Sequence, residues 1–76
     1  MTLQEIIGAN VKRMREALGW SQNKLSFFIY GRNCNPVVSR WEKGEFCPNA
    51  FALKGLSEAF GCTIDELFRE VQDAGL

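Results

Sequence analysis

Residues 21–44, SQNKLSFFIYGRNCNPVVSRWEKG, contain two short helical patterns separated by a turn. Leu25 and Ile29 stand four positions apart, as the apolar residues on one face of a helix do. Ser21 is a residue type that caps helix N-termini. The pattern therefore predicts a short helix over 22–29 with one apolar edge.

The stretch YGRNCN that follows has the composition of a turn. Asn35 before Pro36 is typical of an N-cap followed by proline at the first helical position, and Gly44 is typical of a helix end. This predicts another short helix whose inward face is formed by Val38 and Trp41.

An apolar stripe precedes these two helices at steps of three and four residues, which predicts a longer helix. The stripe consists of Leu3, Ile7, Val11, Met14 and Leu18. Thr2 followed by Glu5 is the pattern of a capping box at the start of this helix, and Gly19 is placed to end it.

Two more helices are predicted after the central region. Asn49 can cap the first and Gly61 can end it, with the apolar residues Phe51, Leu53, Leu56 and Phe60 spaced for packing. Thr63 with Glu66 forms a second capping box, which opens a last helix with Ile64, Leu67, Phe68 and Val71. The result is one all-α domain of five helices over residues 1–76, without a sheet, an internal repeat or a linker.

The composition of the 76 residues is that of a soluble globular domain, with 46% hydrophobic and 24% charged side chains. No apolar run approaches the roughly 20 residues that a membrane span needs, and the N-terminus lacks the features of a signal peptide. We therefore expect no membrane association and a cytoplasmic location.

Histidine is absent, and the three cysteines, Cys34, Cys47 and Cys62, do not form a paired framework. This composition excludes His-based catalysis and the common Cys/His zinc sites. We expect reduced thiols, no metal, no cofactor and no small-molecule ligand. An enzyme is the least favoured class.

Charge is unevenly distributed although the net charge is zero. Between Lys12 and Lys43 there are seven basic and two acidic residues, whereas from Gly44 to Leu76 there are two basic and six acidic residues. Screening at physiological salt acts over about 8 Å, so the basic segment can present a positive surface to a polyanion.

Three strings in this order resemble the Xre-type, Cro- and lambda-repressor-like helix-turn-helix DNA-binding domains: IGANVKRMREALGWSQNKLS, VVSRWEKG and FALKGLSEAFGCTIDELF. The resemblance covers about residues 6–68, leaving 69–76 as the end of the last helix and a tail. It implies a five-helix domain whose third helix reads the major groove of double-stranded DNA, and a small transcriptional regulator, most simply a repressor of phage or mobile-element type.

The resemblance and the residue types together nominate the contacts. The candidates for base reading are Asn35, Pro36, Ser39 and Arg40. The candidates for phosphate contacts are Ser21, Gln22, Arg32, Asn33, Lys43 and Asn49. Arg15 and Glu42 match positions that form a structural, partly buried ion pair in the family.

Several of these residues have more than one possible role. Ser21 and Gln22 are either phosphate ligands or only a cap and a helix former; Arg40 contacts a base, contacts phosphate or stays in solvent. Pro36 either touches a thymine methyl or fixes the helix start. Between Leu25 and Val38 the chain is two residues longer than the family pattern, so the register before the third helix is open.

Two groups of residues are candidates for contact with another protein chain. Phe68, Val71 and Leu76 are either a homodimer surface or ordinary core. Phe27 and Phe28, where the family is often polar, either cover the longer turn or form an exposed patch. Such a patch favours an alternative function, a helix-turn-helix fold used as a protein–protein module such as an antirepressor or adaptor.

Overall fold

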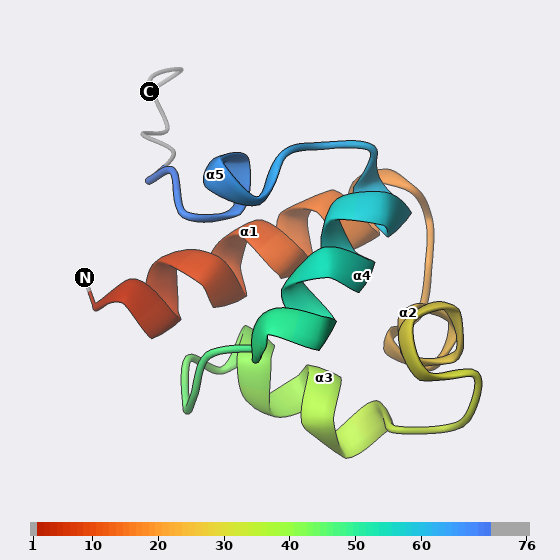
Figure 1. Ribbon diagram of the computed structural model, residues 1–76. Helices are drawn as coiled ribbons and strands as arrows, with labels where there is room; N and C mark the ends of the chain where they lie inside the picture. The colour runs from red at the N-terminus through yellow and green to blue at the C-terminus, as the bar shows by residue number, and fades with distance from the viewer. Residues whose placement is uncertain (1, 71–76) are drawn as a thin grey trace.

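The computed structural model describes residues 2–70, and these form five helices and no strand. In chain order the helices are α1 (Leu3–Ala17), α2 (Gln22–Tyr30), α3 (Asn35–Glu42), α4 (Ala50–Phe60) and α5 (Ile64–Leu67). In Figure 1, α1 runs across the molecule with α3 below it, α4 in front, α5 above, and α2 at the right. The all-α, five-helix fold predicted from the sequence is confirmed.

Side-chain caps define where four of the helices begin. Thr2 with Glu5 and Thr63 with Glu66 form the two capping boxes that their spacing predicts. The Ser21 hydroxyl and the side-chain Oδ1 of Asn49 accept hydrogen bonds from backbone N–H groups three residues on, at 3.0 and 2.9 Å. Each cap satisfies an N–H group that the first helical turn would otherwise leave unpaired.

The start of α3 differs from the prediction by one residue. Asn35 is the first helical residue, and the N-cap is Cys34, which makes no side-chain capping bond. The side-chain Oδ1 of Asn33 accepts a hydrogen bond from the Asn35 backbone N–H at 3.0 Å. A side chain that lies before the N-cap therefore satisfies the first N–H group of α3.

A single core joins the first four helices and α5. Its buried apolar members are Ile7, Val11, Leu25, Ile29, Val38, Trp41, Ala52, Leu56 and Leu67. Gly8 lies buried where α1 meets α3, because a Cβ at this position would collide with the carbonyl oxygen of Trp41. Glycine therefore permits the close approach that fixes α3 against α1.

Three apolar positions predicted for packing lie at the surface. Leu3 and Leu18 are about half exposed at the two ends of α1, and Phe51 is 64% exposed. The other predicted members of this helix, Leu53, Leu56 and Phe60, do pack in or against the core, and Ala52 is buried beside them. Periodicity identified the helices correctly but misplaced the three exposed side chains, because neighbouring helices do not extend over them.

Helix α5 ends at Leu67, earlier than its apolar spacing suggested, and a side chain of α1 binds the backbone at this end. Asn10, 2% exposed, donates from Nδ2 to the carbonyl oxygens of Leu67 and Arg69, both at 2.8 Å. Phe68 is the C-cap of α5. Val71, which the spacing assigned to this helix, lies outside the described residues.

No helix within residues 2–70 is long and apolar enough to cross a bilayer.

Candidate nucleic-acid interface

The turn between α2 and α3 is built around the buried hydroxyl of Ser26. Its Oγ donates to the carbonyl oxygen of Asn23 at 2.8 Å and lies 3.3 Å from that of Arg32. The same oxygen accepts a hydrogen bond from the Cys34 backbone N–H at 3.1 Å. One side chain of α2 thus holds both sides of the turn that leads into α3.

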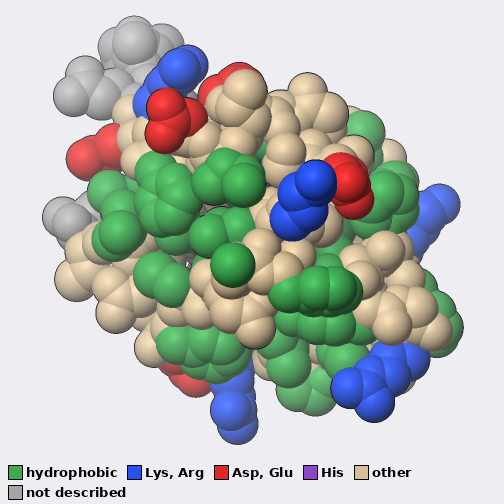
Figure 2. Space-filling model, viewed as in Figure 1, with side chains coloured by type: hydrophobic (Ala, Val, Ile, Leu, Met, Phe, Trp, Pro, Cys, Tyr) green, Lys and Arg blue, Asp and Glu red, His purple; other side chains and the backbone are tan. Residues whose placement is uncertain are grey.

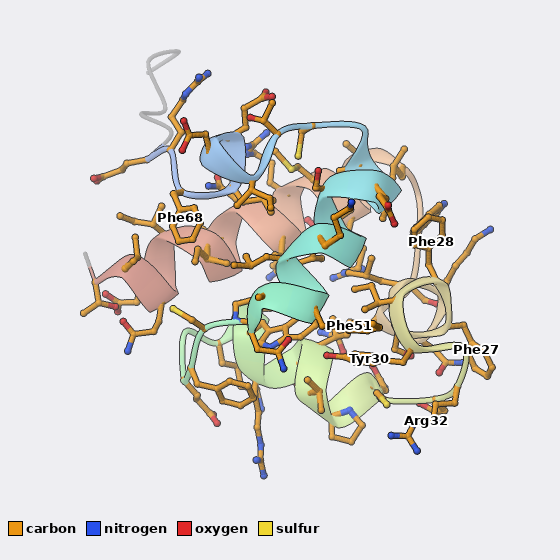
Figure 3. All side chains as sticks on the ribbon, in the orientation of Figure 1. Phe27, Phe28, Tyr30, Arg32, Phe51 and Phe68 are labelled. Atoms are coloured by element: carbon orange, nitrogen blue, oxygen red, sulfur yellow. The ribbon has the colours of Figure 1, made fainter. Side chains whose placement is uncertain are left out.

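Gly31 makes the sharp exit from α2 possible. It is the C-cap in the left-handed conformation, with φ of 71°, which favours glycine. Arg32 and Asn33 follow in the exposed turn. Figure 3 shows Arg32 pointing away from the body of the protein, below the C-terminal end of α2.

The inward and outward sides of α3 are clearly separated. Val38 and Trp41 are buried, as predicted, whereas Pro36 and Arg40 are exposed and Ser39 is half-buried. Among the described residues, Arg40 has one weak ionic contact, Nε to Glu45 Oε1 at 4.0 Å. Its guanidinium can therefore reach a ligand outside the protein.

Asn35 is less available than its position in the sequence implied. It is half-buried, and its side-chain Oδ1 is inaccessible and without a hydrogen-bond partner among the described residues. Paired contacts to an adenine need both the oxygen and the nitrogen of the amide. The side chain must turn before it can make them, so base reading by Asn35 stays a prediction.

The C-terminal end of α3 is tied to α1 by Arg15 and Glu42. Arg15 Nε and Nη2 donate to the two carboxylate oxygens of Glu42 at 2.7 and 3.0 Å, in a two-bond fork. The side chains are 11% and 5% exposed. The hydrogen bond to Glu42 raises the pKa of Arg15. The pair is the one that the resemblance implies.

Gln22 belongs to the same cluster, which the sequence did not reveal. Its Nε2 donates to Glu42 Oε1 at 3.0 Å, and Arg15 Nη1 donates to the Trp20 carbonyl oxygen at 2.7 Å. The cluster of Arg15, Gln22 and Glu42 therefore sets the N-terminus of α2 against the end of α3. Ser21 stands exposed at that N-terminus.

The remaining phosphate candidates lie at helix ends and in the turn. Lys43 is the exposed C-cap of α3, and Asn49 is the exposed N-cap of α4. Within residues 2–70, no carboxylate oxygen lies within 4.0 Å of the charged groups of Arg32 or Lys43. Figure 2 shows basic side chains projecting from the lower edge of the molecule, beneath α3 and the turn.

Phe27 and Phe28 do not cover the turn. They are 49% and 50% exposed, and Phe28 packs beside Trp20 with ring centroids 5.7 Å apart. Figure 3 shows both rings on the outer side of α2. Of the two interpretations, the structure has the exposed patch.

The candidate dimer residues are only partly described. Phe68 is half-buried and packs against the core. Val71 and Leu76 lie outside the described residues.

The cysteines Cys34, Cys47 and Cys62 are free thiols, and burial raises the pKa of Cys62. In the described part of the chain, no group of three His, Cys, Asp or Glu side chains is arranged for a metal ion.

Comparison with known proteins agrees with this geometry. A helix-turn-helix family model matches residues 35–67. A search of curated proteins gives no match. Among solved structures, the P22 c2 repressor protein in complex with the synthetic operator 9T, in the presence of Tl+, is 31% identical with a TM-score of 0.76. The match covers 86% of this chain and 96% of that chain. The chain belongs to the Xre-type, Cro- and lambda-repressor-like helix-turn-helix family.

Proposed function

We propose that the chain is a sequence-specific, double-stranded DNA-binding transcriptional repressor that reads the major groove with α3. The observation that carries this proposal is the likeness, over most of both chains, to a repressor in complex with an operator. An α-helix fits the major groove, where each base pair presents a distinct pattern of donors and acceptors.

The proposal assigns base contacts to the exposed side of α3. Arg40 donates two hydrogen bonds to a guanine, Pro36 lies nearest the incoming turn, and Ser39 lies between them along the helix. Asn35 joins them after its side chain turns outward. The exposure of Arg40 and its weak internal contact support this assignment.

Phosphate contacts surround this surface. Ser21 and Gln22 place the N-terminus of α2 at a phosphate, and Asn49 does the same for α4, because free N–H groups and the helix dipole favour an anion. Lys43, Arg32 and Asn33 contribute from the end of α3 and from the turn. These contacts position the protein and carry no sequence information directly.

The regulator acts in the cytoplasm as a homodimer on two half-sites about one helical turn apart. Members of this fold class place two copies of the recognition helix in successive major grooves. Phe68, Val71 and Leu76 are the candidate residues for the contact between copies.

A selection from random duplex DNA tests the function. The purified chain is titrated against the pool at low and near-physiological salt, and the bound fraction is sequenced. Recovery of a pseudo-palindromic motif, with affinity that falls steeply with salt, supports the repressor. A pool that stays unenriched at low salt contradicts it.

The exposed Phe27 and Phe28 favour a second candidate, a protein–protein interaction module. An apolar protein interface changes little with salt, in contrast to binding that releases counterions from DNA. The same titration therefore separates the two candidates.

A further inference from the structure

The outer side of α2 carries an apolar and cationic surface that the proposed DNA contacts do not use. Lys24, Phe27 and Phe28 stand three and four positions apart, so they share one face of the helix. Trp20 lies beside Phe28, and the Lys24 ammonium sits 5.2 Å from the centre of the Trp20 ring. We call these four residues the α2 patch.

The chemistry of the α2 patch restricts what can cover it. Helix α2 contains no acidic residue, and no described carboxylate lies within 4.0 Å of the Lys24 ammonium. Two half-exposed phenylalanine rings favour an apolar partner, and the uncompensated lysine favours a carboxylate beside it. The complementary surface is therefore apolar with an acidic residue next to the apolar group.

The same chain presents such a surface at α5. Ile64 is 39% exposed, and the next residue, Asp65, is also exposed. Asp65 takes part in no ion pair among the described residues. We call Ile64 and Asp65 the α5 corner. It lies in the acidic part of the chain, whereas the α2 patch lies in the basic part.

The α2 patch and the α5 corner cannot meet within one molecule. Figure 1 shows α2 at the right end of the molecule and α5 at its upper left, with α1 and α4 between them. The greatest extent of the molecule is 37 Å. Contact between the two surfaces must therefore join two copies.

We propose that the α2 patch of one copy binds the α5 corner of a second copy, head to tail. Ile64 packs against the Phe27 and Phe28 rings, and Asp65 pairs with Lys24. The contact is heterologous, so each pair retains one free patch and one free corner and can add further copies. It does not require DNA and is distinct from a symmetric dimer through Phe68.

The contact has a consequence for the proposed repressor. Two surfaces of this size give a weak association between free molecules. Copies held side by side on DNA experience a high effective concentration, so the same contact then favours joint occupation of neighbouring sites. This consequence rests on the proposed function, whereas the contact itself does not.

Sedimentation velocity of the full chain without DNA tests the contact over rising concentrations up to the millimolar range. We expect the average mass of the wild type to increase with concentration, and more weakly at high salt. Lys24→Glu and Asp65→Lys should each weaken association by about tenfold, since each replaces an attractive pair with a repulsive one. An equimolar mixture of the two variants should associate again, because each contact between the two different variants joins opposite charges.

Lys12→Glu is the matched control, because it makes the same charge change at an exposed position of α1. It should associate like the wild type, and circular dichroism verifies that all variants are folded. A wild type that stays monomeric overturns the proposal. Association that survives Lys24→Glu, or variants that fail to associate when mixed, also overturns it. Failure of DNA selection would leave this result untouched, so the two proposals fail independently.

Discussion

The two ends of α3 are held by different kinds of interaction. At the C-terminal end, a buried two-bond ion pair between Arg15 and Glu42 joins α3 to α1. At the N-terminal end, the neutral hydroxyl of Ser26 joins the turn to α2, and no side chain of the N-cap residue contributes. A buried ion pair therefore holds the C-terminal end of α3, whereas hydrogen bonds of one neutral hydroxyl shape the turn before its N-terminal end.

The contacts that orient α3 lie apart from the turn that precedes it. The angle of α3 on the core is set by Gly8, Trp41 and the ion pair, all away from the turn. Arg32 and Asn33 lie exposed in that turn.

Breaking the charged end should have the largest effect. Glu42→Ala leaves the Arg15 guanidinium without its carboxylate in a site that is nearly closed to water. We expect the free energy of unfolding to fall by about 3 kcal/mol, measured by urea denaturation. Glu45→Ala, at an exposed carboxylate, should change it by less than about 0.5 kcal/mol. Equal losses for the two variants would show that the pair does not anchor α3.

Substitution of Arg40 tests whether the exposed side of α3, between its two ends, reads DNA bases. Arg40→Ala should weaken binding to the selected DNA by about 2 kcal/mol and binding to unrelated DNA much less, because base contacts carry the sequence preference. Gln22→Ala should weaken both similarly, as loss of a phosphate contact does. Gel-shift titrations at one salt concentration measure both. Equal losses for Arg40→Ala on every sequence would remove it from the base-reading residues.

Breaking the neutral end should have a smaller effect on stability. Ser26→Ala removes the acceptor of the Cys34 N–H, and we expect a loss of about 1 kcal/mol. Hydrogen exchange should also become faster at the Cys34 amide, since that N–H loses its partner. Ser39→Ala, on the outer side of α3, is the stability control and should be near neutral. A Cys34 amide that exchanges at the wild-type rate would rule out the hydroxyl as the organiser of the turn.

The smallest effect concerns the capping boxes, which α3 lacks. Hydrogen bonds from Thr2 and Thr63 lower the pKa of Glu5 and Glu66 below the ordinary value of 4.5. Their contribution to stability is therefore complete above pH 4.5 and is lost as the pH falls through the lowered pKa of the folded protein. Glu5→Gln with Glu66→Gln should flatten the acid limb of the stability curve. An unchanged acid limb would contradict this linkage.

Local signals in the sequence were reliable where both partners are close in the chain. The caps at Thr2, Ser21, Asn49 and Thr63 were predicted because the capping oxygen and the backbone N–H that donates to it are three residues apart. The start of α3 was predicted one residue late because its N-cap, Cys34, makes no side-chain capping bond of the kind that a sequence pattern reveals. Phe51 was misplaced because periodicity defines a helix face without showing whether another helix covers it.

The features of the candidate site also fall into two groups, those that local sequence predicts and those that depend on tertiary contacts. Residue types and order sufficed for the five helices and the inward side of α3, and the family resemblance implied the pairing of Arg15 with Glu42. The role of Gln22 in that pair, the hold of Asn10 on the end of α5 and the exposure of Phe27 and Phe28 appear only when the helices are assembled. Caps and periodicity depend on neighbours within one turn, whereas these features depend on groups that folding brings together from 20 or 57 residues apart.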